Sequence, residues 1–150
     1  MQVIPVVNDA TTRERLSGPA IRGFLRLADA WNLSAQEKSD LLGASVSRGT
    51  LRNWAQDESA STLNADQLMR VSLLLGIYEG LQRIWRRVPA DADAWLRRAR
   101  QENPFQGQNP LQYMRDGGIV ALVGTRAYVD GATGGPPSRA DYAQPPREEI

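Results

Sequence analysis

The side chains best suited to reading a nucleic acid lie between residues 47 and 53. Arginine can donate two hydrogen bonds to guanine, and asparagine can pair in the same way with adenine. A helix-turn-helix over residues 33–54 would place such donors on its second, recognition helix. The candidate DNA-binding residues are Ser47, Arg48, Thr50, Arg52 and Asn53. The alternative is that residues 33–54 form two ordinary bundle helices with a solvated polar face.

The charge balance restricts any such binding to a local surface. The chain of 150 residues carries 18 Lys and Arg against 17 Asp and Glu, a formal net charge of +1. Residues 1–75 hold eight basic and eight acidic side chains, so this half is neutral. Neutralisation of phosphates supplies most of the non-specific affinity for nucleic acid. The chain as a whole therefore has no electrostatic pull toward DNA or an anionic membrane.

The residues that are missing exclude most catalytic chemistry. The chain has no cysteine and no histidine, which removes disulfides, thiol nucleophiles and imidazole proton transfer near pH 7. Asp116 and Asp130 have no recognisable catalytic partner pattern. Gly107, Gly117 and Gly118 lie too far apart for a glycine-rich phosphate loop. We expect a protein that is not an enzyme, with no cofactor and no metal site.

A group of arginines in the second half of the chain offers a further candidate surface. Its members are Arg83, Arg86, Arg87, Arg97, Arg98 and Arg100. They could bind an acidic partner or a phosphate backbone. The alternative is a solvated helix face on which arginine side chains extend over apolar surface.

The pattern of the N-terminal half predicts helices separated by short turns. Residues 1–15 show no clear period and are expected to form an arm, with a first helix starting at Ser17-Gly18-Pro19. Ser34 to Glu37 has the form of a capping box, in which the two side chains bond each other's backbone N–H groups. A third helix is expected over residues 47–56, with Leu51 and Trp54 facing inward.

A long helix is expected from Asn64 or Ala65 to about Arg87. It carries two apolar stripes and should be buried between neighbours. The stripes are Leu68, Val71, Leu75, Tyr78 and Trp85, and Leu73, Ile77, Leu81, Ile84 and Val88. Gly76 and Gly80 destabilise a helix interior, so their spacing suggests that another backbone approaches closely there. Chance occurrence is the alternative.

The C-terminal half should add helices joined by a turn-rich loop. Asp91 or Asp93 can cap a helix that contains Trp95, residues 103–108 form the loop, and Asn109-Pro110 starts a helix that Gly117-Gly118 ends. Residues 119–129 are ambiguous between strand and helix, and we favour helix because a lone strand would have no partner. Residues 131–150 contain three Gly and four Pro and no apolar period, so they cannot form a core of their own.

The expected architecture is all-α, a small helical bundle around a long central helix. We expect an arm and helix-turn-helix region over residues 1–62, a central helix and binding region over 63–130, and a tail over 131–150 that orders on a partner. The longest apolar stretch, Val71–Ile77, falls well short of the ~20 residues that a membrane span needs. The apolar N-terminus lacks the features of a signal peptide, so a cytoplasmic location is expected.

Several strings occur together in a specific order. They are Leu41-Leu42-Gly43, Thr50-Leu51-Arg52-Asn53-Trp54, Gln67 to Tyr78, Ala94-Trp95-Leu96, and Asn103-Pro104-Phe105 followed by Asn109-Pro110-Leu111 and Gly117-Gly118. With these strings, residues 20–130 resemble the Xre/MbcA/ParS antitoxins, and most closely the ParS subfamily. Such antitoxins are the partners of RES-domain toxins in bacterial type II toxin–antitoxin pairs.

The resemblance implies a fold and an activity. The fold would have an Xre-like helix-turn-helix in the N-terminal half and toxin-binding helices in the C-terminal half. Members dimerise and form a hetero-oligomer with the toxin, which resembles ADP-ribosyltransferases and consumes NAD. The antitoxin covers the active-site cleft of the toxin, and it can repress its own operon by binding operator DNA.

The resemblance also implies candidate toxin-binding residues. Those that match the family's toxin-binding segment are Asn103, Pro104, Phe105, Gly107, Pro110, Leu111, Gly117 and Gly118. Arg126 and Tyr128 match its closing helix. The expected anchors are Phe105, Tyr113, Arg126, Tyr128 and Tyr142. Arg139, Asp141 and Arg147 of the tail are expected to fill polar parts of the toxin's nucleotide cleft.

The chain departs from the family at the helix-turn-helix. Six residues separate Gly43 from Thr50, a longer turn than the family usually has, and Gly49 stands where Arg or Ser is expected. The main hypothesis is that the protein is an antitoxin, which neutralises a RES-domain toxin by steric occlusion. The alternative is a helix-turn-helix transcriptional repressor without a toxin partner.

Overall fold

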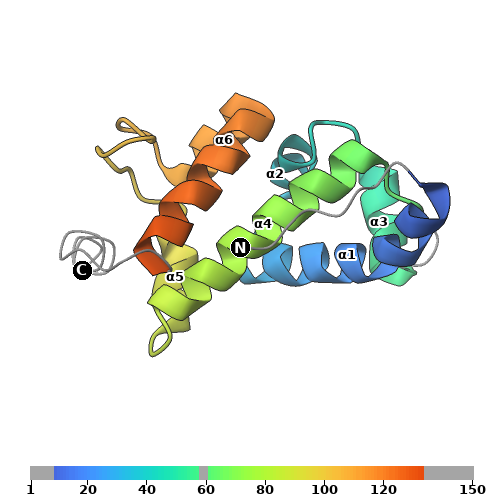
Figure 1. Cartoon of the computed structure of the whole chain (residues 1–150), viewed down its shortest axis with the longest axis horizontal. Coiled ribbons are helices and arrows are strands. Elements are labelled where there is room, and N and C mark those ends of the chain that lie inside the picture. Colours follow the sequence, from blue (N-terminus) through green and yellow to red (C-terminus); the bar gives the residue numbers. More distant parts are fainter. Residues whose placement is uncertain (1–8, 58–60, 134–150) are drawn as a thin grey trace. The chain divides into compact units, whose positions relative to one another are not determined.

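The computed structural model describes residues 9–57 and 61–133, and this part of the chain is helical without strands (Figure 1). The helices are α1 Ala10–Ala30, α2 Ala35–Leu41, α3 Arg48–Gln56, α4 Ala65–Ile84, α5 Pro89–Trp95 and α6 Pro110–Thr133. The chain forms two compact units, residues 1–75 and 76–150, and the division falls within α4. The expected all-α architecture is confirmed. None of these helices has the length and apolar character needed to cross a membrane.

Helix α1 begins earlier than the sequence pattern suggested. Asp9 caps it by accepting a hydrogen bond from the Thr12 N–H at 3.1 Å, so the expected arm over residues 1–15 is wrong from residue 9 onward. Pro19 lies inside the helix instead of at its start. Ser17 is buried, and its hydroxyl donates to the Arg13 carbonyl and accepts from the Leu63 N–H at 2.8 Å. Ser17-Gly18-Pro19, which predicted a helix start, therefore lies within α1, where Ser17 makes a buried polar contact.

The next two helices begin where the sequence predicted. Ser34 and Glu37 form the expected capping box at the start of α2, with both reciprocal hydrogen bonds present. Ser47 caps α3 by accepting from the Thr50 N–H at 3.1 Å. Leu51 and Trp54 face inward, and Trp54 meets Phe24 of α1 edge to face with ring centroids 6.4 Å apart. These aromatic rings join α1 to α3 within the N-terminal unit.

Helix α4 contributes buried apolar side chains along most of its length. Asn64 caps its start by accepting from the Gln67 N–H, and the helix ends at Ile84, three residues before the expected end. Both predicted stripes contribute buried side chains. The buried apolar side chains of α4 are Leu68, Val71, Leu73, Leu74, Ile77 and Leu81. A helix buried on two faces needs neighbours on both.

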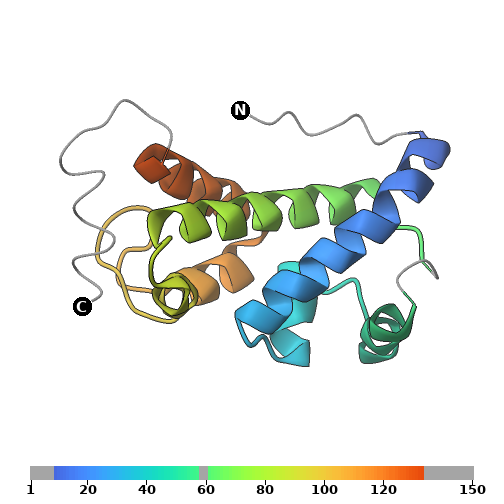
Figure 2. The ribbon, with the colours of Figure 1, turned by 90° about the horizontal axis from the view of Figure 1, so that it is seen from below.

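In the C-terminal unit α6 runs alongside α4 (Figures 1 and 2). Gly76 and Gly80 of α4 lie against side chains of α6. The close approach that we expected at these glycines exists, but side chains make it. A Cβ at Gly76 would overlap the Arg126 guanidinium, and a Cβ at Gly80 would overlap the Val129 Cγ1. The expectation of an approaching backbone was therefore wrong in detail, because the glycines make room for an arginine and a valine.

Helix α5 starts without a carboxylate cap. Pro89 occupies its first turn and Val88 stands at the N-cap with no side-chain hydrogen bond, so capping by Asp91 or Asp93 is wrong. A proline at this position needs no N–H partner and already has the helical φ angle. Asp93 instead accepts a hydrogen bond from Gln82 of α4, and partial burial raises the pKa of its carboxyl group.

Helix α6 is two helical segments joined at Gly118. Asn109 caps the first by accepting from the Gln112 N–H at 2.7 Å, and Pro110 follows it as expected. Gly118 has φ 65° and ψ −149°, a conformation that glycine tolerates best, and Figure 2 shows the two segments pointing in different directions. The predicted stop at Gly117-Gly118 and the choice of helix for residues 119–129 are both confirmed.

The two glycines of α4 give a matched pair for stability measurements. Gly80→Ala should lower the free energy of unfolding by about 1 kcal/mol or more, because overpacking against a β-branched side chain outweighs the gain in helix propensity. Val129 is fully buried and cannot move aside. Gly76→Ala should be close to neutral, since it displaces only the flexible end of Arg126. Urea denaturation of both variants compares them, and a larger loss in Gly76→Ala would contradict this packing.

Candidate functional site

The candidate DNA-binding residues lie together on α3 and its N-cap. Arg48, Arg52 and Asn53 are exposed, while Leu51 and Trp54 hold the opposite face of the helix in the core. Ser47 donates its hydroxyl hydrogen to the Thr50 Oγ1 at 3.1 Å and also caps the helix. The structure thus brings all five candidates onto one short helix. Arg48, Arg52 and Asn53 are exposed and take no part in the capping bonds between Ser47 and Thr50.

The loop between α5 and α6 is closed by backbone hydrogen bonds at its two ends. The Arg100 N–H donates to the Gln108 carbonyl at 3.1 Å, and the Gly107 N–H donates to the Arg100 carbonyl at 2.7 Å. The Leu111 N–H reaches back to the Leu96 carbonyl at 3.0 Å. The segment that resembles the toxin-binding region is therefore a closed loop with defined geometry.

A partly buried ion pair stabilises this loop. The Arg100 side chain pairs with the Glu102 carboxylate at 2.7 Å, and the Tyr128 hydroxyl of α6 donates to the same carboxylate oxygen at 2.8 Å. Arg100 is 3% exposed, so for this residue a solvated helix face is wrong. The other five arginines of that group are exposed. We define Arg100, Glu102 and Tyr128 as the loop clamp.

The loop clamp changes the acidity of Glu102 and Tyr128. Partial burial favours the neutral form of Glu102, but hydrogen bonds from its own backbone, Tyr128 and Arg100 outweigh it and lower the pKa below the ordinary value of 4.5. Burial and the hydrogen bond to Glu102 raise the pKa of the Tyr128 phenol well above 10.0. The clamp is therefore fully charged at Glu102 and neutral at Tyr128 near pH 7.

Aromatic rings surround the loop clamp. Trp95 stacks on Tyr128 with centroids 5.9 Å apart, and the Arg100 guanidinium lies 5.6 Å from the centre of the Trp95 ring. Phe105 meets Trp95, Tyr113 and Tyr128 edge to face at 5.2–5.6 Å. Such contacts fix ring positions as well as burying apolar area. The loop is thus attached to α5 and to both segments of α6.

The predicted toxin-binding residues fall into groups of different exposure. Phe105, Pro110 and Leu111 are buried; Pro104, Tyr113, Gly118, Arg126 and Tyr128 are partly exposed; Asn103, Gly107 and Gly117 are exposed. Phe105, at 1% exposed, is a core residue of the unit and not a surface anchor in this conformation. Arg139, Asp141, Tyr142 and Arg147 lie outside the described residues.

Sequence reasoning missed the residues that support the loop. Glu102 was not singled out, Trp95 appeared only in the Ala94-Trp95-Leu96 string, and Arg100 appeared only in the group of arginines. Their supporting role was not predictable because their partner Tyr128 lies up to 33 residues away and only the fold brings it close. Arg126 has a local partner, the Asp130 carboxylate at 3.1 Å. Within the described ranges, no group of three potential ligands is placed to hold a metal ion.

Glu102→Gln tests the loop clamp. The variant should lower the free energy of unfolding at pH 7 by roughly 1–3 kcal/mol, less than for a fully buried ion pair, because it removes the negative charge that Glu102 places beside the buried Arg100 while Glu102 is 35% exposed. Glu102 has a lowered pKa in the folded state, so its contribution is present above its ordinary pKa and is lost as pH falls through the folded value.

The difference between wild type and Glu102→Gln should therefore shrink in acid. Urea denaturation between pH 7 and pH 3 measures it, and Glu79→Gln, at an exposed position of α4, is the control. A difference that stays constant across this range would show that the charge of Glu102 does not hold the loop.

A comparison with known protein families finds a domain that covers most of the N-terminal unit. Residues 12–76 match the family model of the antitoxin Xre-like helix-turn-helix domain, nearly the range of that unit. The chain is 35% identical over 132 residues to the uncharacterized protein y4oB of Sinorhizobium fredii, covering 87% of this chain and 98% of the relative. No solved structure matches the chain. The chain belongs to the same family as y4oB and carries an antitoxin Xre-like helix-turn-helix domain in its N-terminal half.

Proposed function

We propose that this protein is an antitoxin that neutralises a cognate RES-domain, NAD-consuming toxin by binding it and occluding its active site. The Xre-like antitoxin domain supports an antitoxin or DNA-binding regulator. The RES partner rests on the resemblance of residues 103–118 to the toxin-binding segment of the ParS-type antitoxins. The proposed assembly is a homodimer of this chain within a hetero-oligomer with the toxin.

The observation that carries the proposal is exposed apolar surface on α6. Val120 is 75% exposed and Val123 is 51% exposed, and both follow the kink at Gly118. Large apolar side chains in such positions mark interaction surfaces when they occur together on one element. They lie directly after the segment that resembles the toxin-binding region.

The loop and α6 form one continuous candidate surface. A Cβ at Gly124 would lie 3.2 Å from the Tyr113 hydroxyl and 3.8 Å from Pro104, so the loop rests on this helix. Asn103 and Gly107 of the loop are exposed and offer polar groups to a partner. A rigid surface of this kind loses little conformational entropy on binding, which favours tight inhibition.

The valines can be tested in the presence of the toxin. The double variant Val120→Asp, Val123→Asp should lower affinity for a RES-domain toxin encoded beside this gene by about 100-fold or more, because it places two charges in an apolar contact. The assay is NAD consumption by the purified toxin titrated with antitoxin. Val88→Asp is the matched control, since Val88 is 48% exposed and lies outside α6.

The same assay separates this surface from the tail. We propose that Arg139, Asp141, Tyr142 and Arg147 enter the nucleotide cleft of the toxin, so a chain that ends after Gly131 should still bind but inhibit less. Equal inhibition by the truncated chain would reject the tail contribution. Equal inhibition by the valine double variant would reject the α6 surface, and the absence of any complex with wild type would reject the toxin partnership.

A second candidate function is repression through operator DNA, either alone or in complex with the toxin. The exposed Arg48, Arg52 and Asn53 on α3 favour it, together with the family of the N-terminal domain. The neutral charge of this half implies that affinity depends on a few specific contacts, since it provides little non-specific attraction.

Arg48→Ala and Arg52→Ala test this role. If the arginine contacts a base, its loss should weaken binding to the DNA upstream of the gene by about 1–3 kcal/mol. If it contacts a phosphate, the slope of log affinity against log salt concentration should become shallower by about one. Fluorescence anisotropy at several salt concentrations measures both quantities. Arg26→Ala, at an exposed position of α1, is the control and should change neither.

A further inference from the structure

The turn that precedes the recognition helix has few apolar contacts of its own. Gly43, Ala44 and Ser45 are exposed, and only Val46 is buried before α3 begins. Gly43 and Ala44 have φ angles of 81° and 58°, in the left-handed region. This conformation costs free energy at Ala44 and needs support from neighbours.

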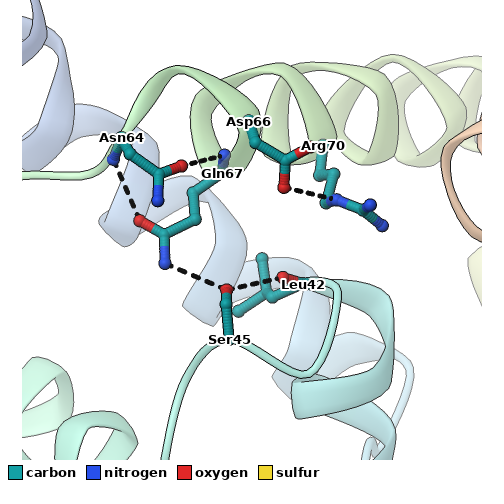
Figure 3. A network of polar contacts seen from close by, with 6 residues as sticks. All are labelled: Leu42, Ser45, Asn64, Asp66, Gln67 and Arg70. Atoms are coloured by element: carbon teal, nitrogen blue, oxygen red, sulfur yellow. Dashed lines mark hydrogen bonds and ion pairs between the residues drawn. The ribbon is translucent and has the colours of Figure 1, made fainter.

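Helix α4 supplies that support through one side chain that serves two partners. The Gln67 Oε1 accepts from the Asn64 N–H at 3.0 Å, and the Gln67 Nε2 donates to the Ser45 hydroxyl at 3.1 Å (Figure 3). The Ser45 hydroxyl in turn donates a hydrogen bond to the Leu42 carbonyl at 2.9 Å. The start of α4 and the turn are therefore joined by one chain of hydrogen bonds.

Arg70 adds a second contact one turn further along α4. Its guanidinium bonds the Asp66 carboxylate at 2.8 Å (Figure 3). A Cβ at Gly43 would lie 3.0 Å from Arg70 Cζ. The Arg70 side chain thus covers the left-handed turn residue, where any residue other than glycine would be strained and crowded.

We propose that Gln67 is a positioning residue for DNA recognition, which sets the placement of α3 by holding the turn through Ser45. This rests on the proposed DNA-binding role of α3. The Gln67 amide accepts from Asn64 through its oxygen and donates to Ser45 through its nitrogen, whereas an ionised carboxylate can only accept. A glutamate at this position would keep the cap of α4 and lose the donor to the turn.

This chemistry defines a pair of substitutions that remove the same hydrogen bond from opposite ends. Gln67→Glu retains the capping acceptor, and Ser45→Ala removes the bond without introducing a charge. If the bond positions α3, the double variant should be no weaker in DNA binding than the weaker single variant. If the charge of the glutamate were the cause instead, Gln67→Glu would lower DNA affinity further in a chain that already carries Ser45→Ala.

The experiment compares two duplexes of equal length, the DNA upstream of this gene and a scrambled sequence. Each single variant should lower affinity for the upstream duplex about threefold to tenfold and leave the scrambled duplex unchanged, because misplacement of α3 affects base contacts most. Thermal unfolding should stay at the wild-type midpoint for Gln67→Glu. Amide NMR shifts should change over residues 43–52 and not over residues 76–133.

The outcomes distinguish the two proposals. Unchanged discrimination between the duplexes, or unchanged amide shifts over residues 43–52, overturns the role of Gln67 and leaves DNA binding by α3 intact. If wild type binds neither duplex, DNA recognition itself fails, and the role of Gln67 in recognition falls with it. Lower affinity for both duplexes by the same factor would indicate general loss of structure and would also overturn the proposal.

Discussion

Burial of the apolar surface of α4 is the constraint on which the rest of the structure depends. Its residues from Leu68 to Leu81 are apolar on two faces, and such a helix is stable in water only when other helices cover both. The first part of α4 belongs to the N-terminal unit and the second part to the C-terminal unit. In the C-terminal unit Gly80 provides the space in which Val129 of α6 packs, so the sequence of α4 also selects which residues can cover it.

Polar contacts then determine where the exposed, functional segments lie. In the N-terminal unit, Asn64 and Gln67 cap α4 and at the same time hold the turn before α3. In the C-terminal unit, the loop clamp attaches the segment after α5 to α6. In both units, polar side chains on or next to a core helix support a surface segment that buries little apolar area of its own. This arrangement suits a protein that acts by presenting preformed surfaces, since binding requires no catalytic group.

Local signals predicted the helices well wherever a cap or a break decided the boundary. The capping box at Ser34, the cap at Ser47 and the stop at Gly118 all depend on residues within four positions of one another. The start of α1 also had such a signal, Asp9 before Thr12, but Ser17-Gly18-Pro19 resembled a stronger one. Ser17 proved to be a partner of Leu63, a contact across 46 residues that no local pattern can report.

The sequence by itself determined the all-helical architecture, the inward faces of the helices and the exclusion of thiol and imidazole chemistry, because periodicity, capping and composition are local or global properties of the chain. Only the tertiary structure decided that Arg100 is a buried member of a clamp and not a surface arginine, that Phe105 belongs to the core, and that Gln67 reaches the turn before α3. The physical reason is that burial and hydrogen-bond partnership depend on which distant side chains occupy the same space. In this protein those distant partners, more than the motif residues themselves, position the surfaces proposed to bind DNA and toxin.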